Sequence, residues 1–570
     1  MPDPNASSTP SEAATSPRTA TTVAVLALAA AALFVGWSLF WFVCDDAYIT
    51  FRYASNRQLG WGYVWNPPPF APVEGYTSFS WLVLVDAVWA WFGVEPPVAA
   101  PALGLLCAWG TLLVIAGWLW RLRLPAELDA DRPWLLAWVF VGVLSNTTFL
   151  AWTSSGLEAP LVVLLLTAWA SLGMVAPRGT WWPLAMMSVA SMITLTRPDG
   201  LLFLAATPVV IAADRLLRGW GKQDVWAVGP VLVVWSHLLW RKSTYDAWLP
   251  NTYLAKVLDP WPEMGIRYFK LFVVQYGYFL WVPLALCALW VARRALISPR
   301  AWARNLPGLV ALGALLAHTA YYVLRVGGDH FEFRVLAHWP ALLMIAAVWM
   351  LSWVARRGAW VGAGMALLTL AGGVIAWPDW IQNREIEDSR AQRMSRPVAP
   401  KLPTWLGPWT ELHDQLEKAA TRQAVAISHQ THRTFAIRHG RNYPAREDAL
   451  AALDASVWDP GRIDADAYPV HKASSVGLPA WRMPTVAVID ILGLNDEVVA
   501  RTEPSSERLR VMAHTRRPPA GYVDCFQPNV KATSTLKVRP RREPLSWDGI
   551  ARCQADFLLR ARRGELKAGK

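Results

Sequence analysis

Charge is scarce in this chain. Only 17% of its 570 residues are charged, whereas 54% are hydrophobic, and stretches such as 19–44 and 96–120 contain no Asp, Glu, Lys or Arg. This composition excludes a soluble enzyme of this size and predicts a polytopic membrane protein. The net charge of +12 is then informative mainly through the positions of Lys and Arg. We expect a lipid bilayer around the chain and no nucleic acid as a partner.

Cysteine is also rare, and its spacing excludes a common kind of site. The five cysteines form no CxxC pair, which argues against a zinc or redox centre. Cys525 and Cys553 fall together in the polar C-terminal third. If that region lies outside the cytoplasm, these two residues can form a disulfide.

The uncharged runs divide the first two thirds of the chain into predicted membrane spans. Residues 1–20, rich in Ser, Thr, Pro and Ala, are expected to be a disordered cytoplasmic tail. The run 23–43 has the length of a span rather than of a signal-peptide core. Eleven spans are expected, at 23–43, 98–120, 134–152, 158–176, 182–196, 200–216, 225–240, 271–292, 306–325, 336–355 and 359–377.

Basic residues gather on one side of these spans. They fall in the loops at 121–132, 178, 215–222, 293–304 and 356–357. By the positive-inside rule this side is cytoplasmic, which places the N-terminus inside and the chain after residue 377 outside.

One apolar stretch, "SFSWLVLVDAVWAWFG" at 78–93, remains outside this scheme. Counting it as a span would move every later basic loop to the outside. It is short, contains Asp86 and is rich in Trp, which is typical of the membrane interface. We therefore expect an interfacial or re-entrant helix on the outer face.

Four outer loops contain unusual polar residues. Charged groups near a bilayer are energetically costly, so a set that faces one way predicts a functional site. Taken singly, each residue could equally solvate a loop end or anchor a helix at the headgroups. The loops are 44–77 with Asp45, Asp46, Arg52 and Glu74, 196–199 with Arg197 and Asp199, 241–270 with Asn251 and Lys256, and 326–334 with Asp329, His330, Glu332 and Arg334.

The adjacent acids Asp45 and Asp46 are the candidate catalytic residues. Carboxylates at this position can hold a divalent cation against a phosphate, or one of them can act as a general base on an attacking hydroxyl. Neighbouring residues of a helix point about 100° apart. We therefore expect one acid to face the reaction centre and the other to pair with a cation such as Arg52. Either acid could also cap the helix that follows.

The other outer loops predict a site for a phosphate and a sugar. The Gly/Pro-rich loop at 60–81 contains Trp and Tyr, whose flat faces can stack on a sugar, and Asn, whose amide can form hydrogen bonds with it. Glu74 is the residue of this loop least suited to anchoring the chain at the membrane interface. Arg197, Lys256 and Arg334 suit a phosphate on a lipid, so that a basic pocket is expected.

Structural alternatives remain open for some of these residues. Arg197 with Asp199, or Asp329 with Arg334, can form local ion pairs. Asp329 beside His330 is a weak metal motif.

The tail after residue 377 has more charge and fewer long apolar runs, which indicates a mixed α/β domain. "PTVAVIDILGLNDEVVAR" at 484–501 predicts a buried strand, a turn and an amphipathic helix. "AVAIS" at 424–428 predicts another short strand. His514 lies in a polar loop, where it either binds a ligand or is an ordinary surface residue.

Seven segments, in chain order between residues 41 and 525, resemble one known superfamily. They resemble the GT-C membrane glycosyltransferases that use polyprenyl-phosphate sugars. Within this superfamily, the chain is most similar to the cell-wall branch that adds terminal β-(1→2) arabinofuranose. The segments are "DDAYITFRYASN", "GYVWNPPPFAPVEGYTS", "SSGLEAPL", "TRPDGLLF", "LPNTYLAK", "GGDHFEFR" and "DILGLNDEVVAR".

The resemblance implies a mainly α-helical GT-C membrane domain at 21–377, with about eleven transmembrane helices plus outer-face juxtamembrane helices. It also implies a C-terminal α/β periplasmic domain at 378–570 that contributes to acceptor binding. The first outer loop, 44–97, would carry the catalytic Asp, which maps onto Asp45 and Asp46, with Asp46 preferred.

The reaction implied by the resemblance transfers a sugar from a polyprenyl-phosphate donor to a cell-envelope glycan, at the outer face of a bacterial cytoplasmic membrane. The predicted donor-site residues are Arg52, Glu74, Arg197, Asp199, Asn251, Lys256, His330 and Arg334, and His514 is the predicted acceptor-site residue.

The resemblance leaves two chemical questions open. Some members use a divalent cation (Mg, Mn or Ca), for which Asp45 and Asp46 would be the ligands. A single in-line attack assisted by an Asp base inverts the anomeric carbon, whereas the β-(1→2) branch, starting from a β-linked donor, would have to retain it. Retention needs a nucleophile, for which Glu74 is the candidate, or a same-face mechanism. The segment "ISHQTHRTFAIRHG" at 427–440 departs from the family pattern, which bears on the sugar and the acceptor.

Two other classes of function compete with an enzyme. A transporter or flippase of lipid-linked sugars also has charges among its helices, but transporters show repeated halves with charge at the bilayer midplane. This sequence shows no internal repeat. A non-catalytic scaffold of envelope assembly predicts that substitutions at Asp45 and Asp46 are tolerated.

Overall fold

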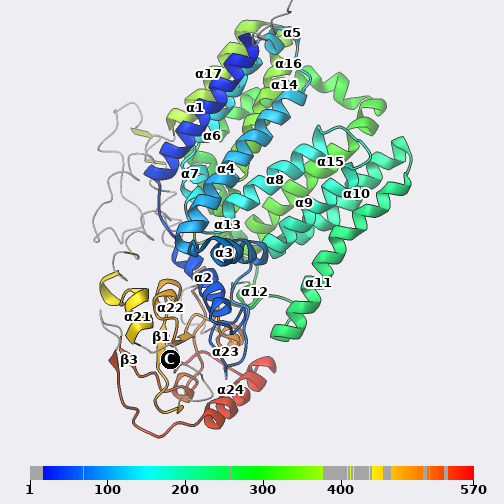
Figure 1. Ribbon diagram of the computed structural model, residues 1–570. Helices are drawn as coiled ribbons and strands as arrows, with labels where there is room; N and C mark the ends of the chain where they lie inside the picture. Colours follow the sequence, from blue (N-terminus) through cyan, green and yellow to red (C-terminus); the bar gives the residue numbers. More distant parts are fainter. Residues whose placement is uncertain are drawn as a thin grey trace, which may run out of the picture.

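The computed structural model is mainly helical, as predicted (Figure 1). It describes residues 17–68, 70–256, 259–375, 440–452, 464–504, 510–512, 514–531 and 537–569, with six further positions between 407 and 436. The predicted strand at 424–428, nearly all of segment 427–440, and residues 1–16 lie outside the described residues.

Six helical segments of the described chain are long and apolar enough to cross a membrane, which agrees with a multi-pass membrane protein. A seventh is counted if α6 (Arg132–Leu144) and α7 (Thr147–Thr153), bent by 73° at their junction, form one span. The six are α1 (Pro17–Leu39), α4 (Pro96–Arg121), α10 (Leu201–Arg218) with η1, α14 (Trp281–Ile297) with η3, α15 (Pro299–Ala320) with η4, and α16 (Trp339–Val354) with η5 and η6.

The other predicted spans correspond to shorter or less apolar helices, so the total of eleven stays a prediction. Three of these spans are shorter apolar helices, namely α8 (Ala159–Met174), α9 (Trp182–Thr196) and α17 (Ala359–Ile375). The stretch 78–93, expected to be an interfacial or re-entrant helix rather than a span, contains the short apolar helix α3 (Phe79–Phe92), and its place at the interface stays a prediction. The predicted span 225–240 lies within η2 (Lys222–Ala227) and α11 (Val228–Tyr245). The remaining helices of this part are α2 (Asp45–Gln58), α5 (Ala126–Ala130), α12 (Asn251–Lys256) and α13 (Pro262–Gln275).

The first span ends earlier than the predicted residue 43. Helix α1 stops at Leu39, and the chain then runs in a non-helical conformation to Cys44. The Cys44 amide donates to the Ser155 carbonyl at 2.9 Å, and the Phe42 amide donates to the Ser154 hydroxyl at 3.4 Å. These long-range bonds replace the helical bonds of the last turn and fix where α2 begins.

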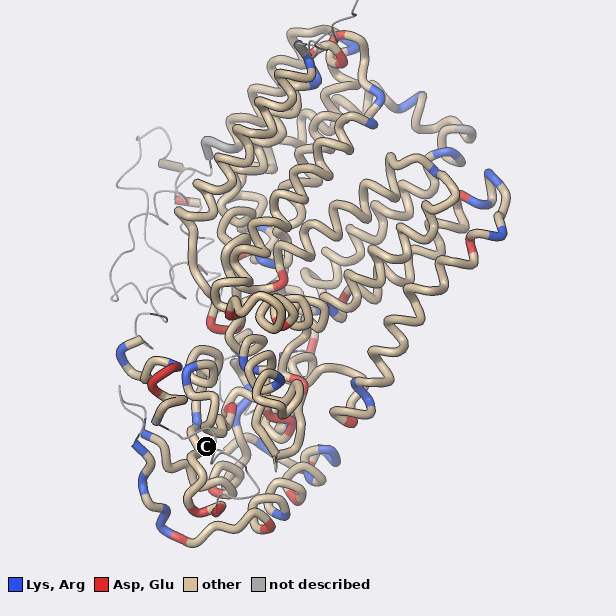
Figure 2. The backbone as a smooth tube through the Cα atoms, in the orientation of Figure 1, with Lys and Arg blue, Asp and Glu red and all other residues tan. Residues whose placement is uncertain are grey.

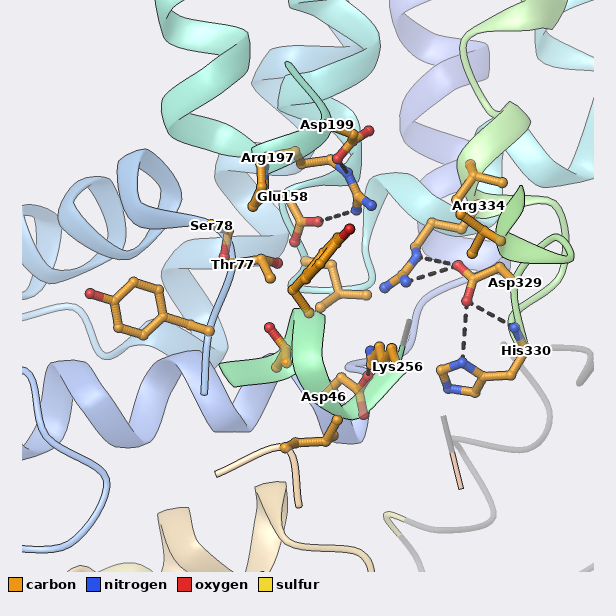
Figure 3. A pocket seen from close by; sticks show the side chains of 18 of the residues that line it. Asp46, Thr77, Ser78, Glu158, Arg197, Asp199, Lys256, Asp329, His330 and Arg334 are labelled. Carbon is orange, nitrogen blue, oxygen red and sulfur yellow. Dashed lines mark hydrogen bonds and ion pairs between the residues drawn. The ribbon is translucent and has the colours of Figure 1, made fainter. Parts of the chain in front are cut away.

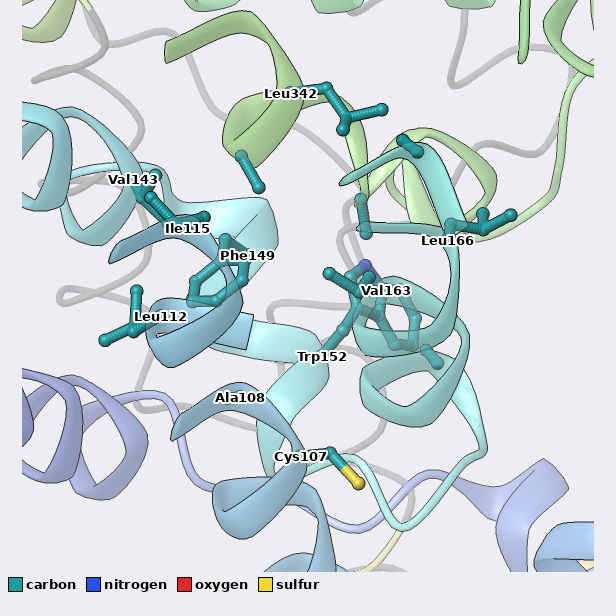
Figure 4. Packing of buried hydrophobic residues seen from close by; sticks show 14 of the residues in the cluster. Cys107, Ala108, Leu112, Ile115, Val143, Phe149, Trp152, Val163, Leu166 and Leu342 are labelled. Carbon is teal, nitrogen blue, oxygen red and sulfur yellow. The ribbon is translucent and has the colours of Figure 1, made fainter. Parts of the chain in front are cut away.

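A buried core joins α4, α7 and α8. Leu112 and Ile115 of α4 lie beside Phe149 of α7, and Trp152 of α7 lies beside Val163 of α8 (Figure 4). All five side chains are buried, which provides much of the stabilisation of these helices by dispersion and close packing. This packing fixes the turn after α7, from which Glu158 projects.

The membrane helices and the C-terminal region meet at one end of the bundle. Figure 1 shows the C-terminal elements below α2, α3 and α12, whereas the opposite ends of the long helices point away from them. Figure 2 shows Lys and Arg at those far helix ends. The basic loops and the C-terminal region therefore lie at opposite ends, the arrangement expected from the charge pattern of the sequence.

The C-terminal region contains two small sheets. Strand β1 (Val470–Ala473) pairs in parallel with β2 (Ala487–Asp490), with Val470 opposite Ala487, and α22 (Gly477–Arg482) crosses between them. The predicted buried strand, turn and helix at 484–501 are confirmed as β2, residues 491–496 and α23 (Glu497–Arg501). The other described elements are α21 (Arg446–Ala452), η9 (Val523–Cys525), the antiparallel pair β3 (Val530–Lys531) and β4 (Lys537–Val538), and α24 (Trp547–Arg562).

A disulfide joins Cys525 of η9 to Cys553 of α24, the pairing that was open at the level of the sequence. It closes a loop with a sequence separation of 28 residues. We expect its loss in Cys525→Ser to destabilise the C-terminal region by about 3–4 kcal/mol, because the cross-link limits the entropy of the unfolded chain. The check is the unfolding temperature with and without reductant. Cys287→Ser, which removes a free cysteine, is the control, and a reductant-insensitive wild type would contradict the prediction.

A buried carboxyl makes the stability of the C-terminal region depend on pH. Burial raises the pKa of Asp496 to about 7, although its contacts with the Val499 amide and the Tyr522 hydroxyl lower it. Because the folded chain holds this proton more tightly than the unfolded chain, stability falls as pH rises from about 4 through 7. Asp496→Asn should flatten that fall. The check is the unfolding temperature of both proteins between pH 4 and 8, and identical slopes would contradict it.

Candidate active site

Helix α2 begins immediately at the two candidate acids. Cys44 is its N-cap residue, in an extended conformation and without a side-chain cap, and Asp45 and Asp46 occupy the first turn. Carboxylates there are favoured by the partial positive charge of a helix N-terminus. The alternative in which Asp45 or Asp46 caps α2 is therefore wrong, because the capping position belongs to Cys44.

Asp46 lies at the wall of a cavity of about 310 Å³ between the membrane helices and the C-terminal region. Ile49 and Thr50, which share its helix face at spacings of three and four residues, also line the cavity. One Asp46 carboxylate oxygen lies 3.8 Å from the Lys256 ammonium at the end of α12. Figure 3 shows these two side chains together at one wall.

Asp45 points to a different neighbour. Its carboxylate accepts hydrogen bonds from the amides of Gly477, at 3.3 Å, and Leu478, at 2.9 Å, at the start of α22. Asp45 is not among the residues that line the cavity. The two adjacent acids thus face different partners, as their angular separation on a helix requires.

Arg52 is not the partner of either acid, which corrects the predicted pairing. Its guanidinium is fully buried and donates to four backbone carbonyls, those of Trp65, Ala480, Met483 and Val486, at 3.0–3.2 Å. Burial lowers its pKa to about 9. Arg52 therefore joins α2 to the C-terminal region and does not reach the cavity.

Arg197 lies at a second wall of the cavity within a network of ion pairs. It contacts the carboxylates of Glu158 at 2.8 Å and Asp199 at 3.1 Å, and it donates to the Tyr322 hydroxyl at 2.7 Å (Figure 3). Asp199 also contacts the His318 imidazole at 2.7 Å. The local pair of Arg197 with Asp199 proposed as a structural alternative is present, but Glu158 extends it.

Arg334 forms the third charged wall with Asp329 and His330. Its guanidinium contacts the Asp329 carboxylate at 2.8 Å, and the same carboxylate accepts from the His330 amide at 2.8 Å (Figure 3). Burial opposes ionisation of Asp329, but the Arg334 charge prevails and holds the pKa of this carboxyl well below its usual range. Asp329 therefore remains an anion.

The cavity is not simply basic, which corrects a second prediction. Among the described residues that line it, three cations meet four carboxylates, and each carboxylate lies within 4 Å of at least one cation. Sequence spacing could not reveal this balance, because the pair of Arg197 with Glu158 spans 39 residues. The cations are Arg197, Lys256 and Arg334, and the anions are Asp46, Glu158, Asp199 and Asp329.

Glu74 and Asn251 lie beside the cavity rather than at its wall. Glu74 is buried against Arg241 at 2.6 Å, and burial raises its pKa to about 7 although Arg241 lowers it. Asn251 donates to the carbonyls of Gly493 and Leu494 at 2.8 and 3.0 Å. Neither residue is among those that line the cavity: the Glu74 carboxylate holds the Arg241 side chain, and the Asn251 side chain holds the backbone at 493–494. Glu74 is accordingly not placed as a second carboxylate at the cavity.

His514 lies close to the edge of the cavity. Its ring centroid is 5.3 Å from that of His330, and its Nδ1 lies 2.8 Å from the Met512 carbonyl oxygen. Met512 itself lines the cavity, whereas His514 does not.

The residues at the cavity do not fit a resident divalent cation. The described part of the chain contains no group of three or more His, Cys, Asp or Glu side chains that could hold a metal. Asp45 directs its oxygens to backbone amides and so does not converge with Asp46 on one ion.

Sequence reasoning missed several residues that line the cavity. Glu158 lies in the segment "SSGLEAPL", which was singled out for its resemblance, but it was not assigned to the site. Tyr253, Tyr321 and Tyr322 add aromatic surface, and Leu494 belongs to the C-terminal region. An acid at the end of an uncharged run was a signal that could have identified Glu158.

No protein-family model and no curated protein matches the chain. Among solved structures, it is similar to ArnT from Cupriavidus metallidurans bound to undecaprenyl phosphate, with 13% identity, a TM-score of 0.45, and coverage of 82% of this chain and 86% of that chain. It is also similar to the arabinosyltransferase EmbB from Mycobacterium smegmatis, with 14% identity, a TM-score of 0.34, and coverage of 75% and 43%.

A third similar structure is the Archaeoglobus fulgidus oligosaccharyltransferase tethered with an acceptor peptide, with 13% identity, a TM-score of 0.34, and coverage of 82% of this chain and 63% of that chain. At these identities and TM-scores, the three likenesses carry no argument about the chemistry of this chain. The arabinofuranosyl branch stays a prediction.

Proposed function

We propose that the protein is a GT-C type glycosyltransferase that moves a sugar from a polyprenyl-phosphate donor to a cell-envelope glycan at the outer face of a bacterial cytoplasmic membrane. The observation that carries the proposal is Asp46, which faces a 310 Å³ cavity beside Lys256 at the end of the membrane bundle. An acid and a cation at one wall suit a hydroxyl acceptor and a phosphate leaving group. Arabinofuranose is the sugar suggested by the resemblance of the sequence.

Asp46 is proposed as the general base. It accepts the proton of the acceptor hydroxyl while that oxygen forms a bond to the anomeric carbon. The bond from the anomeric carbon to the phosphate oxygen breaks, and the electron pair leaves with the polyprenyl phosphate. Such an in-line displacement inverts the anomeric carbon, so it does not by itself give the β-(1→2) linkage from a β-linked donor that the resemblance implies.

Lys256 and Arg334 are proposed to bind the phosphate. Both line the cavity, and the Arg334 guanidinium points into it (Figure 3). Because Asp329 already contacts Arg334, the Arg334 guanidinium is held in a fixed orientation before the donor binds. A preorganised cation stabilises the developing charge of the leaving group at little entropic cost.

A second cavity in the C-terminal region is proposed to hold the acceptor chain. Its volume is about 800 Å³, and the described residues that line it include no carboxylate side chain. Ile491 lines this cavity and Leu494 lines the first, three residues further along the same loop, so the two sites are close enough for one glycan. Its polar lining residues are Asn442, Tyr443, His471, Lys472, Ser474, Ser475 and Arg517.

The function is tested by supplying the purified protein with a panel of polyprenyl-phosphate sugars and soluble glycan acceptors. Transfer, or slow hydrolysis of one donor, is expected, and the anomeric configuration of the product distinguishes inversion from retention. A folded protein that neither transfers nor hydrolyses any donor would overturn the proposal. Donor movement across vesicles without chemistry would instead indicate a flippase.

A further inference from the structure

Helix α2 presents two working faces. Asp46, Ile49 and Thr50 line the cavity, whereas Asp45 and Arg52, seven residues apart and so on one side of the helix, contact the C-terminal region. The side chains of the second face contact both ends of one helix, α22. Asp45 accepts from the amides at its start, and Arg52 donates to the carbonyls of Ala480 and Met483 at its end.

The charges of this contact match the polarity of α22. A carboxylate at the start of a helix and a cation at its end are each favourable, because the first amides and last carbonyls of a helix lack internal partners. The backbones also touch, since a Cβ atom built on Gly477 would lie 1.8 Å from the Asp45 carbonyl oxygen. Only glycine allows this approach.

A short segment of chain connects α22, which contacts α2, to the wall of the cavity. Helix α22 leads into β2, and Asp490 at its end accepts from the amides of Leu492, Gly493 and Asn495. This carboxylate fixes the loop from which Leu494 enters the wall of the cavity. The register of α22 on α2 thus sets the position of part of the cavity wall.

We propose that Asp45 is a positioning residue that, together with Arg52 and Gly477, docks the C-terminal region over the cavity and closes it against water. The inference rests on the proposed glycosyl transfer for its kinetic consequence, but not for the docking itself. If the wall is displaced, water competes with the acceptor hydroxyl for the donor. Hydrolysis then releases the free sugar and the polyprenyl phosphate.

Two variants test the docking in independent ways. Asp45→Asn removes the charge and one acceptor, and Gly477→Ala keeps every polar group but blocks the backbone approach. Gly179→Ala is the matched control, since a Cβ there meets nothing within 4 Å. Hydrogen exchange of the peptides that cover 470–500 should rise about tenfold or more in both test variants and not in the control.

The kinetic readout is the ratio of donor hydrolysis to transfer. We expect this ratio to rise severalfold in Asp45→Asn and Gly477→Ala, with a higher KM for the acceptor and little change in the KM for the donor. Unchanged exchange in both test variants would overturn the docking role. Raised hydrogen exchange with an unchanged ratio of hydrolysis to transfer would overturn the proposal that this docking closes the cavity against water. If no donor reacts even with the wild type, the proposed function fails while the exchange experiment still decides the docking.

Discussion

Asp46→Asn is expected to lower the rate of sugar transfer by about 10²–10⁴-fold. The amide keeps the size of the carboxylate but cannot accept the proton of the acceptor hydroxyl at neutral pH. Binding of the donor should change little, because Lys256 and Arg334 are untouched. The measurement is kcat for transfer from the donor that the wild type uses, together with donor binding to the variant.

Asp45→Asn and Asp556→Asn are the controls for this prediction. Asp45 is the same type of residue on the same turn of α2. Its substitution should reduce the rate of transfer by about tenfold, because α22 is displaced and not because a proton acceptor is lost. Asp556 is an exposed acid of α24, paired with Arg560 at 3.7 Å, and its loss should have no effect. If Asp46→Asn is fully active while Asp45→Asn is inactive, the roles assigned to the two acids are reversed.

Arg52→Met is expected to be the most destabilising single change considered. Removing the guanidinium takes a donor from four buried carbonyls, and the loss falls mainly on those of Ala480 and Val486, because the Trp65 carbonyl keeps a bond from the Asn56 side-chain amide and the Met483 carbonyl keeps one from the Val486 amide. Each buried acceptor left unpaired costs about 1–3 kcal/mol. Relief of the buried charge offsets part of this, so we expect a net loss of about 3–5 kcal/mol.

The loss is measured by the unfolding temperature of the detergent-solubilised protein and by hydrogen exchange at 480–486. Arg552→Met, on the exposed surface of α24, is the matched control and should leave both unchanged. Arg52→Lys keeps the charge but presents a single amine, so an intermediate loss is expected. An unfolding temperature of Arg52→Met equal to that of the wild type would contradict the prediction.

Local sequence patterns predicted the parts of this protein that depend on nearby residues. Hydrophobic runs identified the long helices, and a short apolar run followed by a turn at 484–501 identified β2 and α23, because such runs reflect the burial of an element. The pair of Asp329 with Arg334, five residues apart, was foreseen as an alternative.

Contacts between distant parts of the chain could not be predicted in this way. Arg52 and its carbonyl partners are up to 434 residues apart, and Glu74 is 167 residues from Arg241. A buried arginine held by carbonyls leaves no complementary charge in the sequence to indicate its partner. Arg52 therefore resembled a partner for the nearby acids, and only the fold reveals its role.

The docking of α22 on α2 also sets the order in which the protein is assembled during synthesis. Arg52 leaves the ribosome 428 residues before its partner Ala480. At about 5–20 residues per second, this interval lasts about 20–90 s. Throughout it, the membrane helices exist without the Leu494 and Met512 side of the cavity. A nascent chain arrested before residue 480 would thus expose the unsatisfied face of α2, a feature that cellular quality control can recognise.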